Sequence, residues 1–211
     1  MKANPWLGLV IGLITPLVLA GETGTAARVN GTDISNFRLE RHFVDYLKIQ
    51  GRQVGAIRSP MAYKRLKREA LQQLIDKELL WQEARRRGLA VSDDEVAASI
   101  AELKAAFPDT QAFARALEEA GFDEAGYRDY LRHELAASRM LDELAEVVPP
   151  SAEDVRSAYQ GLKLQLDPAM DEARGMALVR QYLTGQRMAQ GREAALEKLR
   201  RQGRVEVLVV L

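Results

Sequence analysis

The sequence predicts a mainly α protein, made of several helices and closed by a short β pairing of its N- and C-terminal segments. Three observations carry this prediction. Apolar residues recur three and four apart through most of the chain, which is the spacing of one helix face. Helix-capping residues and helix-ending Gly or Pro separate these stretches. Residues 205–210, VEVLVV, are a β-type run after the last of them.

The first expected elements are a short strand and a helix. Ala27-Arg28-Val29 reads as the strand, and Asn30-Gly31 reads as a tight turn because this pair tolerates positive φ. Asp33 and Ser35 are good helix caps, so we expect a helix from about residue 35 to residue 50. The C-terminal strand is expected to pair with Arg28-Val29, which ties the last helix to the first.

Capping residues place the middle helices. Ser59 followed by Pro60 starts a helix that runs to about Arg87, where Gly88 ends it. Ser92 and Glu95 form a capping box for the next helix. In this way the sequence predicts helices over about 60–87, 92–106, 109–121, 123–146, 151–162 and 170–201, the last weakened by Gly185 and Gly191.

The first twenty residues have the pattern of a targeting segment. Lys2 is followed by fifteen residues without a charge, Trp6 to Ala20. This run is short of the roughly 20 residues of a membrane span, and it ends in small residues that suit cleavage after Ala20. We expect a signal peptide over residues 1–20 and one exported helical domain over 21–211, with N-terminal helices in 27–162 and a helix and strand in 170–211. The alternative is an uncleaved anchor in the inner membrane, facing the periplasm.

Composition excludes several classes of function. The chain of 211 residues carries 30 Lys and Arg against 30 Asp and Glu, so it lacks the basic excess of a nucleic-acid coat. It has no cysteine, and its two histidines, His42 and His133, lie far apart in sequence. No phosphate-binding loop or nucleophile elbow is present. We therefore expect no catalytic residue, no bound cofactor and no metal.

A basic run stands out at the start of the second helix. Lys64, Arg65, Lys67 and Arg68 fall within five residues. One interpretation is a solvated helix surface, which is the common role of such charges. The other is attraction to an acidic client or to anionic lipid.

Several stretches, in this order, resemble the SurA-like and PrsA-like periplasmic foldases. They begin with Val29-Asn30-Gly31 and a capped helix, and they cover nearly all of residues 27–211. The main ones are LQQLIDKELL at 71–80, VSDDEV at 91–96, VPPSAEDVRSAY at 148–159, and the closing residues 196–208. The resemblance implies a SurA-type chaperone domain, mainly α, with a role in protein folding and outer-membrane protein assembly.

One departure from that family bears on activity. Its full-length members carry a parvulin prolyl-isomerase domain before the last helix, whereas here the space is Leu162 to Met170. A domain needs at least about 50 residues. The resemblance therefore implies the chaperone module without the isomerase, and isomerase activity stays an alternative by family membership only.

The resulting hypothesis is an ATP-independent holdase that binds unfolded or exported polypeptides. The alternative from another class is a dedicated assembly partner of one exported protein. A homodimer formed by exchange of the terminal strands or the last helix is also compatible with the sequence. The aromatic and apolar residues expected to contact clients are Tyr46, Met61, Tyr63, Phe107 and Phe113.

Overall fold

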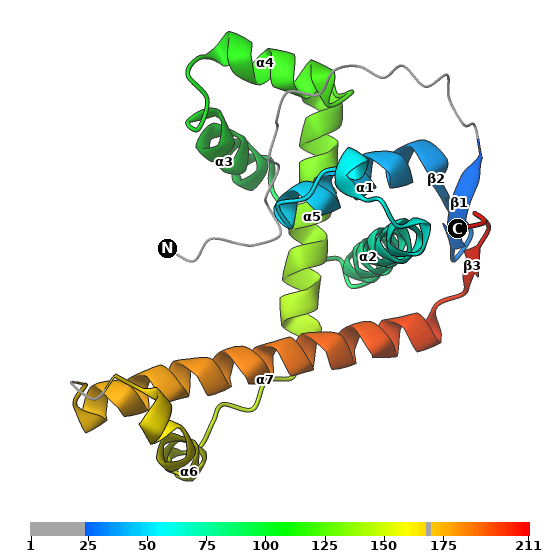
Figure 1. Ribbon diagram of the computed structural model, residues 1–211. Helices are drawn as coiled ribbons and strands as arrows, with labels where there is room; N and C mark the ends of the chain where they lie inside the picture. The colour runs from blue at the N-terminus through cyan, green and yellow to red at the C-terminus, as the bar shows by residue number, and fades with distance from the viewer. Residues whose placement is uncertain (1–23, 168–169) are drawn as a thin grey trace. The chain divides into compact units, whose positions relative to one another are not determined.

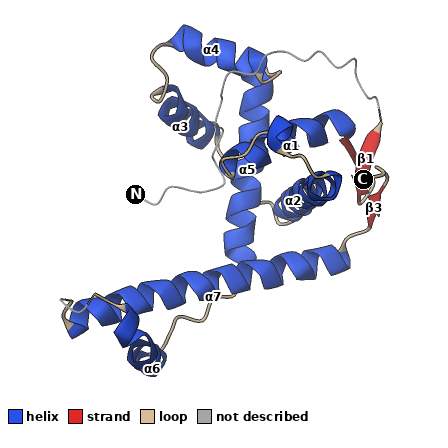
Figure 2. Cartoon of the chain, in the orientation of Figure 1, coloured by secondary structure: helices blue, strands red, loops and turns tan. Residues whose placement is uncertain are grey.

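The computed structural model describes residues 24–167 and 170–211 (Figure 1). These residues form seven α-helices and one three-stranded sheet, which confirms the predicted mainly α class (Figure 2). The signal peptide predicted over residues 1–20 lies outside the described residues. Of the helices in this part of the chain, none combines the length and the apolar character that a membrane crossing requires.

The described residues divide into two compact units. The first contains residues 24–140 and 199–211, and the second contains residues 141–198. From the sequence we predicted one domain with two parts, residues 27–162 and 170–211. The two units of the structure divide the chain at other positions, after residue 140 and after residue 198. Two long helices, α5 (Glu124–Leu144) and α7 (Glu172–Gln202), contribute residues to both units.

The sheet of the first unit joins segments from the two ends of the described chain. Its strands are β1 (Thr25–Val29), β2 (Thr32–Ser35) and β3 (Val205–Val207), in the order β2-β1-β3 with antiparallel pairing. Asn30 and Gly31 both have positive φ, as the two-residue turn between β1 and β2 requires. In β1 and β3, Arg28 faces Glu206 and Val29 faces Val205, which confirms the predicted pairing.

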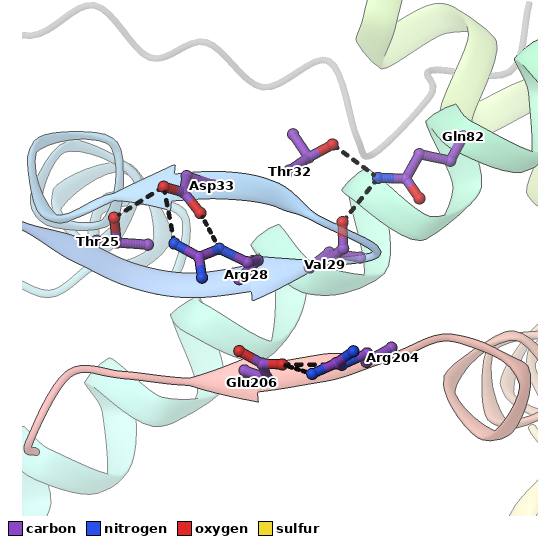
Figure 3. Close-up of polar contacts among 8 residues, drawn as sticks. All are labelled: Thr25, Arg28, Val29, Thr32, Asp33, Gln82, Arg204 and Glu206. Atoms are coloured by element: carbon purple, nitrogen blue, oxygen red, sulfur yellow. Dashed lines mark hydrogen bonds and ion pairs between the residues drawn. The ribbon is translucent and has the colours of Figure 1, made fainter.

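Strand β2 was not expected, because Asp33 was interpreted as a helix cap. Its carboxylate instead accepts hydrogen bonds from Thr25 Oγ1 at 3.1 Å and Arg28 Nε at 2.5 Å, both on β1 (Figure 3). The hairpin is fastened to helix α2 (Pro60–Arg86) by Gln82. The amide of Gln82 donates to the Val29 carbonyl at 3.1 Å and to Thr32 Oγ1 at 3.3 Å.

Helices α1 (Asn36–Ile49) and α2 begin where the capping residues predict. The Ser35 hydroxyl accepts from the Arg38 amide at 3.2 Å, and the Ser59 hydroxyl accepts from the Ala62 amide at 3.3 Å. The two helices pack together, with the Phe43 ring edge-on to Tyr63 at 5.2 Å between centroids. Residues 50–59 join them and include a 3-10 turn, η1 (Val54–Ala56).

Three further helices complete the first unit: α3 (Asp93–Lys104), α4 (Thr110–Glu119) and most of α5. Ser92 and Glu95 form the predicted capping box, and Asp109 caps α4 by accepting from the Ala112 amide at 2.7 Å. The core of the first unit contains buried apolar side chains from these helices, from α1 and α2, and from the sheet. Its largest buried side chains are Phe43, Phe113, Ile34, Leu39, Leu47, Ile75, Leu80 and Met140.

A buried ion pair fastens the end of α7 to α2 within the first unit. Asp76 is almost fully buried and accepts from Arg200 Nε at 2.7 Å and Nη2 at 2.6 Å. Gln72 adds a third hydrogen bond to the same carboxylate at 2.9 Å. This planar pairing of guanidinium and carboxylate fixes geometry as well as charge.

The second unit contains helix α6 (Ala152–Leu162), a 3-10 turn η2 (Lys163–Gln165) and most of α7. Val155, Tyr159 and Val179 form its small core. The helix α7 runs unbroken through Gly185 and Gly191, which were expected to weaken it. Gly175 is required for packing here, because a Cβ at this position would lie 2.6 Å from the ring of Tyr159.

Candidate functional site

A cavity of about 240 Å³ opens within the first unit between α1, α2 and α5. Helix α1 supplies half of its lining, and the turn before α5 closes one side. The lining combines four apolar or aromatic side chains with four charged ones, one histidine and one glycine. The lining residues are Phe37, Arg38, Arg41, His42, Asp45, Leu74, Gly121, Phe122, Tyr130 and Glu134.

The residues from α1 belong to a second face of that helix. Leu39, Phe43 and Leu47, spaced by four, are buried in the core. The cavity residues 37, 38, 41, 42 and 45 form the neighbouring stripe, with spacings of one, three and four. Phe37 lies at the opening and keeps 64% of its surface exposed. Helix α1 thus holds the core with one face and lines the cavity with the next.

Aromatic rings form the wall opposite α1, and Arg41 of α1 reaches across to them. The Arg41 guanidinium lies over the Phe122 ring, 3.8 Å from its centroid, which is a cation–π geometry. Phe122 also packs against Tyr130 at 5.1 Å between centroids. Gly121 has φ 72°, a left-handed conformation that favours glycine, and it turns the chain from α4 into this wall.

The acidic groups of the cavity are paired or shifted by burial. Glu134 is only 9% exposed and its Oε2 lies 2.7 Å from Lys77 Nζ, so its charge is compensated. Burial raises the pKa of Asp45. Burial, with the nearby charge of Glu134, raises the pKa of Tyr130 and brings that of Tyr127 to about 12. Both phenols therefore stay neutral at physiological pH.

His42 is neutral as well. Burial first, and then the charge of Lys77, lower the pKa of His42 to about 4. Its Nε2 lies 3.1 Å from Gln73 Oε1, so the ring is held in place. A histidine with this pKa is poorly suited to proton transfer near pH 7. Within residues 24–167 and 170–211, no cluster of His, Asp and Glu has a metal-binding arrangement. The cavity can bind an apolar group; it holds no activated nucleophile.

The five side chains predicted to contact clients lie outside the cavity lining. Three belong to the α1–α2 pair. Tyr46 donates from its hydroxyl to Glu69 at 2.5 Å, Tyr63 packs on Phe43, and Met61 is 73% exposed. Tyr46 and Tyr63 are half-buried, so part of each ring faces solvent.

The other two lie in the α3–α4 region, in contact with each other at 5.5 Å between ring centroids. Phe107 is half-buried, but Phe113 is only 2% exposed and also meets Tyr127. Phe113 is therefore a core residue, and the expectation that it contacts clients is corrected. A break between two helices does not leave a side chain open when its own helix face packs inward.

Sequence reasoning missed the cavity residues Phe37, Phe122 and Tyr130. One signal was available: Phe37 is out of phase with the buried stripe of α1, so an apolar residue there indicates a second apolar contact. Phe122 and Tyr130 gave no such signal, because aromatic residues at helical spacing are most often core. Their meeting with Arg41 depends on tertiary packing between α1 and α5.

The chain matches a known protein family. The SurA-like N-terminal domain family matches residues 3–141, about two thirds of the chain. The match ends at residue 141, one residue after the segment 24–140 that makes up most of the first unit. No curated protein matches the sequence. Because the family matches residues 3–141 and the fold is mainly α, this chain belongs to the SurA-like N-terminal domain family.

Proposed function

We propose that this protein is an ATP-independent periplasmic chaperone, a holdase that binds unfolded exported polypeptides through the cavity of its first unit. Membership of the SurA-like family supports a chaperone-type role. The observation that carries the proposal is the cavity itself, which is lined by Phe37, Leu74, Phe122 and Tyr130 and whose buried Glu134 is already paired with Lys77.

The size of the cavity supports side-chain capture. Pockets that enclose drug-sized ligands measure roughly 300–1,000 Å³, and this one is smaller, at about 240 Å³. It suits one large apolar side chain of an extended client. Because the client loses conformational freedom on binding, such an interaction is weak and reversible. Weak contacts allow release without a nucleotide, by competition with client folding.

The internal connection between α6 and α7 supports a role without a built-in isomerase. Only the turn η2 and a few residues join the two helices. We propose that the protein acts in the periplasm after removal of residues 1–20, and that client proteins include outer-membrane proteins. Tyr46, Tyr63 and Phe107, which keep part of their rings exposed, are proposed as secondary client contacts.

The proposal is tested by aggregation of an unfolded outer-membrane protein diluted from denaturant, followed by light scattering. We expect the protein to suppress scattering near an equimolar ratio without ATP. Replacement of Phe37 by Ala should weaken suppression about fivefold, since losing part of one apolar contact costs about 1 kcal/mol. Tyr182→Ala is the matched control, because Tyr182 is an exposed aromatic residue of the second unit.

Two results would contradict this proposal, the first its binding site and the second its activity. If Phe37→Ala and Tyr182→Ala suppress aggregation equally well, the cavity is not the client site. If the protein suppresses aggregation of neither the outer-membrane protein nor an unrelated soluble client, the holdase is refuted and the alternative, a dedicated partner of one exported protein, is favoured. Co-purification would then identify that partner.

A further inference from the structure

The segment from Tyr46 to Arg68 has an unusual charge. It contains seven Lys and Arg and no Asp or Glu, in a chain whose basic and acidic residues are equal in number. The rest of the chain consequently carries 23 basic against 30 acidic residues. The basic segment, residues 46–68, comprises the end of α1, the connection through η1 and the first turns of α2.

Helix α2 presents part of this charge on one face. Met61, Lys64, Arg65 and Arg68 follow the spacing i, i+3, i+4, i+7, and all four are exposed. Lys67 lies off this face, where it bonds to Glu40 and to the Tyr63 hydroxyl. The basic face, residues 61, 64, 65 and 68, is thus separate from the packed side of the helix.

Apolar side chains project from the same end of the α1–α2 pair. Ile49, Val54 and Met61 are 62%, 40% and 73% exposed. The contacts of Phe43 with Tyr63 and of Tyr46 with Glu69 hold the end of α1 beside the start of α2. The three apolar residues therefore lie at the end of the helix pair that carries the basic face.

The cations of this surface are largely uncompensated. Among the residues that the structure describes, no carboxylate pairs with Arg52, Arg58, Lys64 or Arg68. Arg65 meets Glu69 at 3.8 Å, but both side chains are exposed and such a pair contributes little. A surface charge without partners is available to an external anion.

We propose that the basic segment docks the protein on an anionic membrane surface, with Lys64, Arg65 and Arg68 facing lipid headgroups and Ile49, Val54 and Met61 entering the interface. One feature favours lipid over an acidic protein. Basic residues alone would serve either partner, but exposed aliphatic side chains among them match the boundary between headgroups and acyl chains. Met61, predicted as a client contact, is assigned to this surface.

The test is flotation of the full chain with vesicles of phosphatidylcholine alone or mixed with phosphatidylglycerol. Residues 1–23 are present in every protein compared, so their contribution is common to all of them, and phosphatidylcholine vesicles report its apolar part. We expect stronger binding to anionic vesicles, and this excess should fall as salt rises from about 0.05 to about 0.5 M. The triple variant Lys64→Gln, Arg65→Gln, Arg68→Gln should lose about a hundredfold of the anionic partition coefficient.

A matched control has the same composition and net charge: Lys163→Gln, Arg174→Gln, Arg180→Gln, at three exposed positions of the second unit. It should bind anionic vesicles within about twofold of the wild type. Met61→Gln should weaken binding several-fold at low and high salt alike, because its contribution is apolar. Aggregation suppression should be unchanged in all of these variants, which separates this proposal from the holdase.

Three outcomes would overturn the membrane assignment. The first is equal binding to neutral and anionic vesicles. The second is equal loss in the two triple variants, which would indicate net charge alone. The third is binding of a soluble glutamate-rich peptide that needs Lys64, Arg65 and Arg68, without any excess on anionic vesicles; the partner would then be an acidic protein.

Discussion

Replacement of Arg200 by Met should destabilise the first unit strongly. It removes both hydrogen bonds from the guanidinium to Asp76 and leaves a carboxylate that is 5% exposed with one remaining donor, Gln72. Breaking a buried pair from one side costs about 3–5 kcal/mol. Arg200 itself is 30% exposed, so water can reach the vacated position. We expect a loss of about 2–4 kcal/mol, or roughly 5–12 °C in melting temperature.

The loss is measured by urea unfolding followed by circular dichroism. Arg180→Met, an exposed position on the same helix, is the control and should cost under about 0.5 kcal/mol. The double variant Asp76→Leu, Arg200→Met should recover much of the loss, because an apolar pair needs no compensation. If Arg200→Met is as stable as Arg180→Met, the ion pair does not hold α7 to α2 and the reasoning fails.

Three other predictions concern the core, the pH dependence and the last helix. Phe113→Ala should lower the free energy of unfolding in urea by about 3–5 kcal/mol, since Phe113 is 2% exposed. Phe107→Ala should cost less than half as much, because Phe107 is half-buried. Equal costs would contradict this difference in burial. Burial lowers the pKa of His42 to about 4 in the folded protein. As pH falls, His42 is therefore protonated in the unfolded chain before it is protonated in the folded protein. Stability should therefore decrease below about pH 6.5, by roughly 2 kcal/mol at pH 5, and His42→Gln should flatten urea midpoints measured from pH 8 to pH 5. Gly185→Ala should stabilise α7 by about 0.5–1 kcal/mol, because a Cβ at this position meets no other atom. Gly175→Ala should destabilise the second unit, because its Cβ would clash with the ring of Tyr159. If both variants change the melting temperature in the same direction, this contrast is refuted.

Features with a local cause could be predicted from the sequence. Ser59, Ser92 and Asp109 each start a helix by accepting a backbone amide a few residues ahead, and that bond needs nothing from the rest of the chain. The pairing of β1 with β3 was also predictable, because a C-terminal β-type run needed a partner and the sequence offered few.

Features that depend on distant contacts could not be predicted. Asp33 resembles a cap in sequence, but it lies in β2, which pairs with β1, and its carboxylate bonds to Arg28 across that pair. The cavity exists because Arg41 of α1 reaches the Phe122 ring near the start of α5, and no local pattern reports that meeting. For Phe113 the position beside a helix break was given too much weight. Its spacing with Ala116 and Leu117 is that of a buried helix face, and burial followed that spacing.

The pairing of β1 with β3 also bears on how the first unit completes its fold. The Arg204 amide donates to Asn30 Oδ1 across 174 residues of sequence. Contacts between residues so far apart form late, because the chain loses the entropy of closing a long loop before the contact can stabilise it. Until the C-terminal residues dock, one edge of β1 has no strand beside it and Asp76 lacks Arg200. An unpaired strand edge can pair with another chain, so the partly folded first unit is exposed to aggregation of the kind that it is proposed to prevent in other proteins.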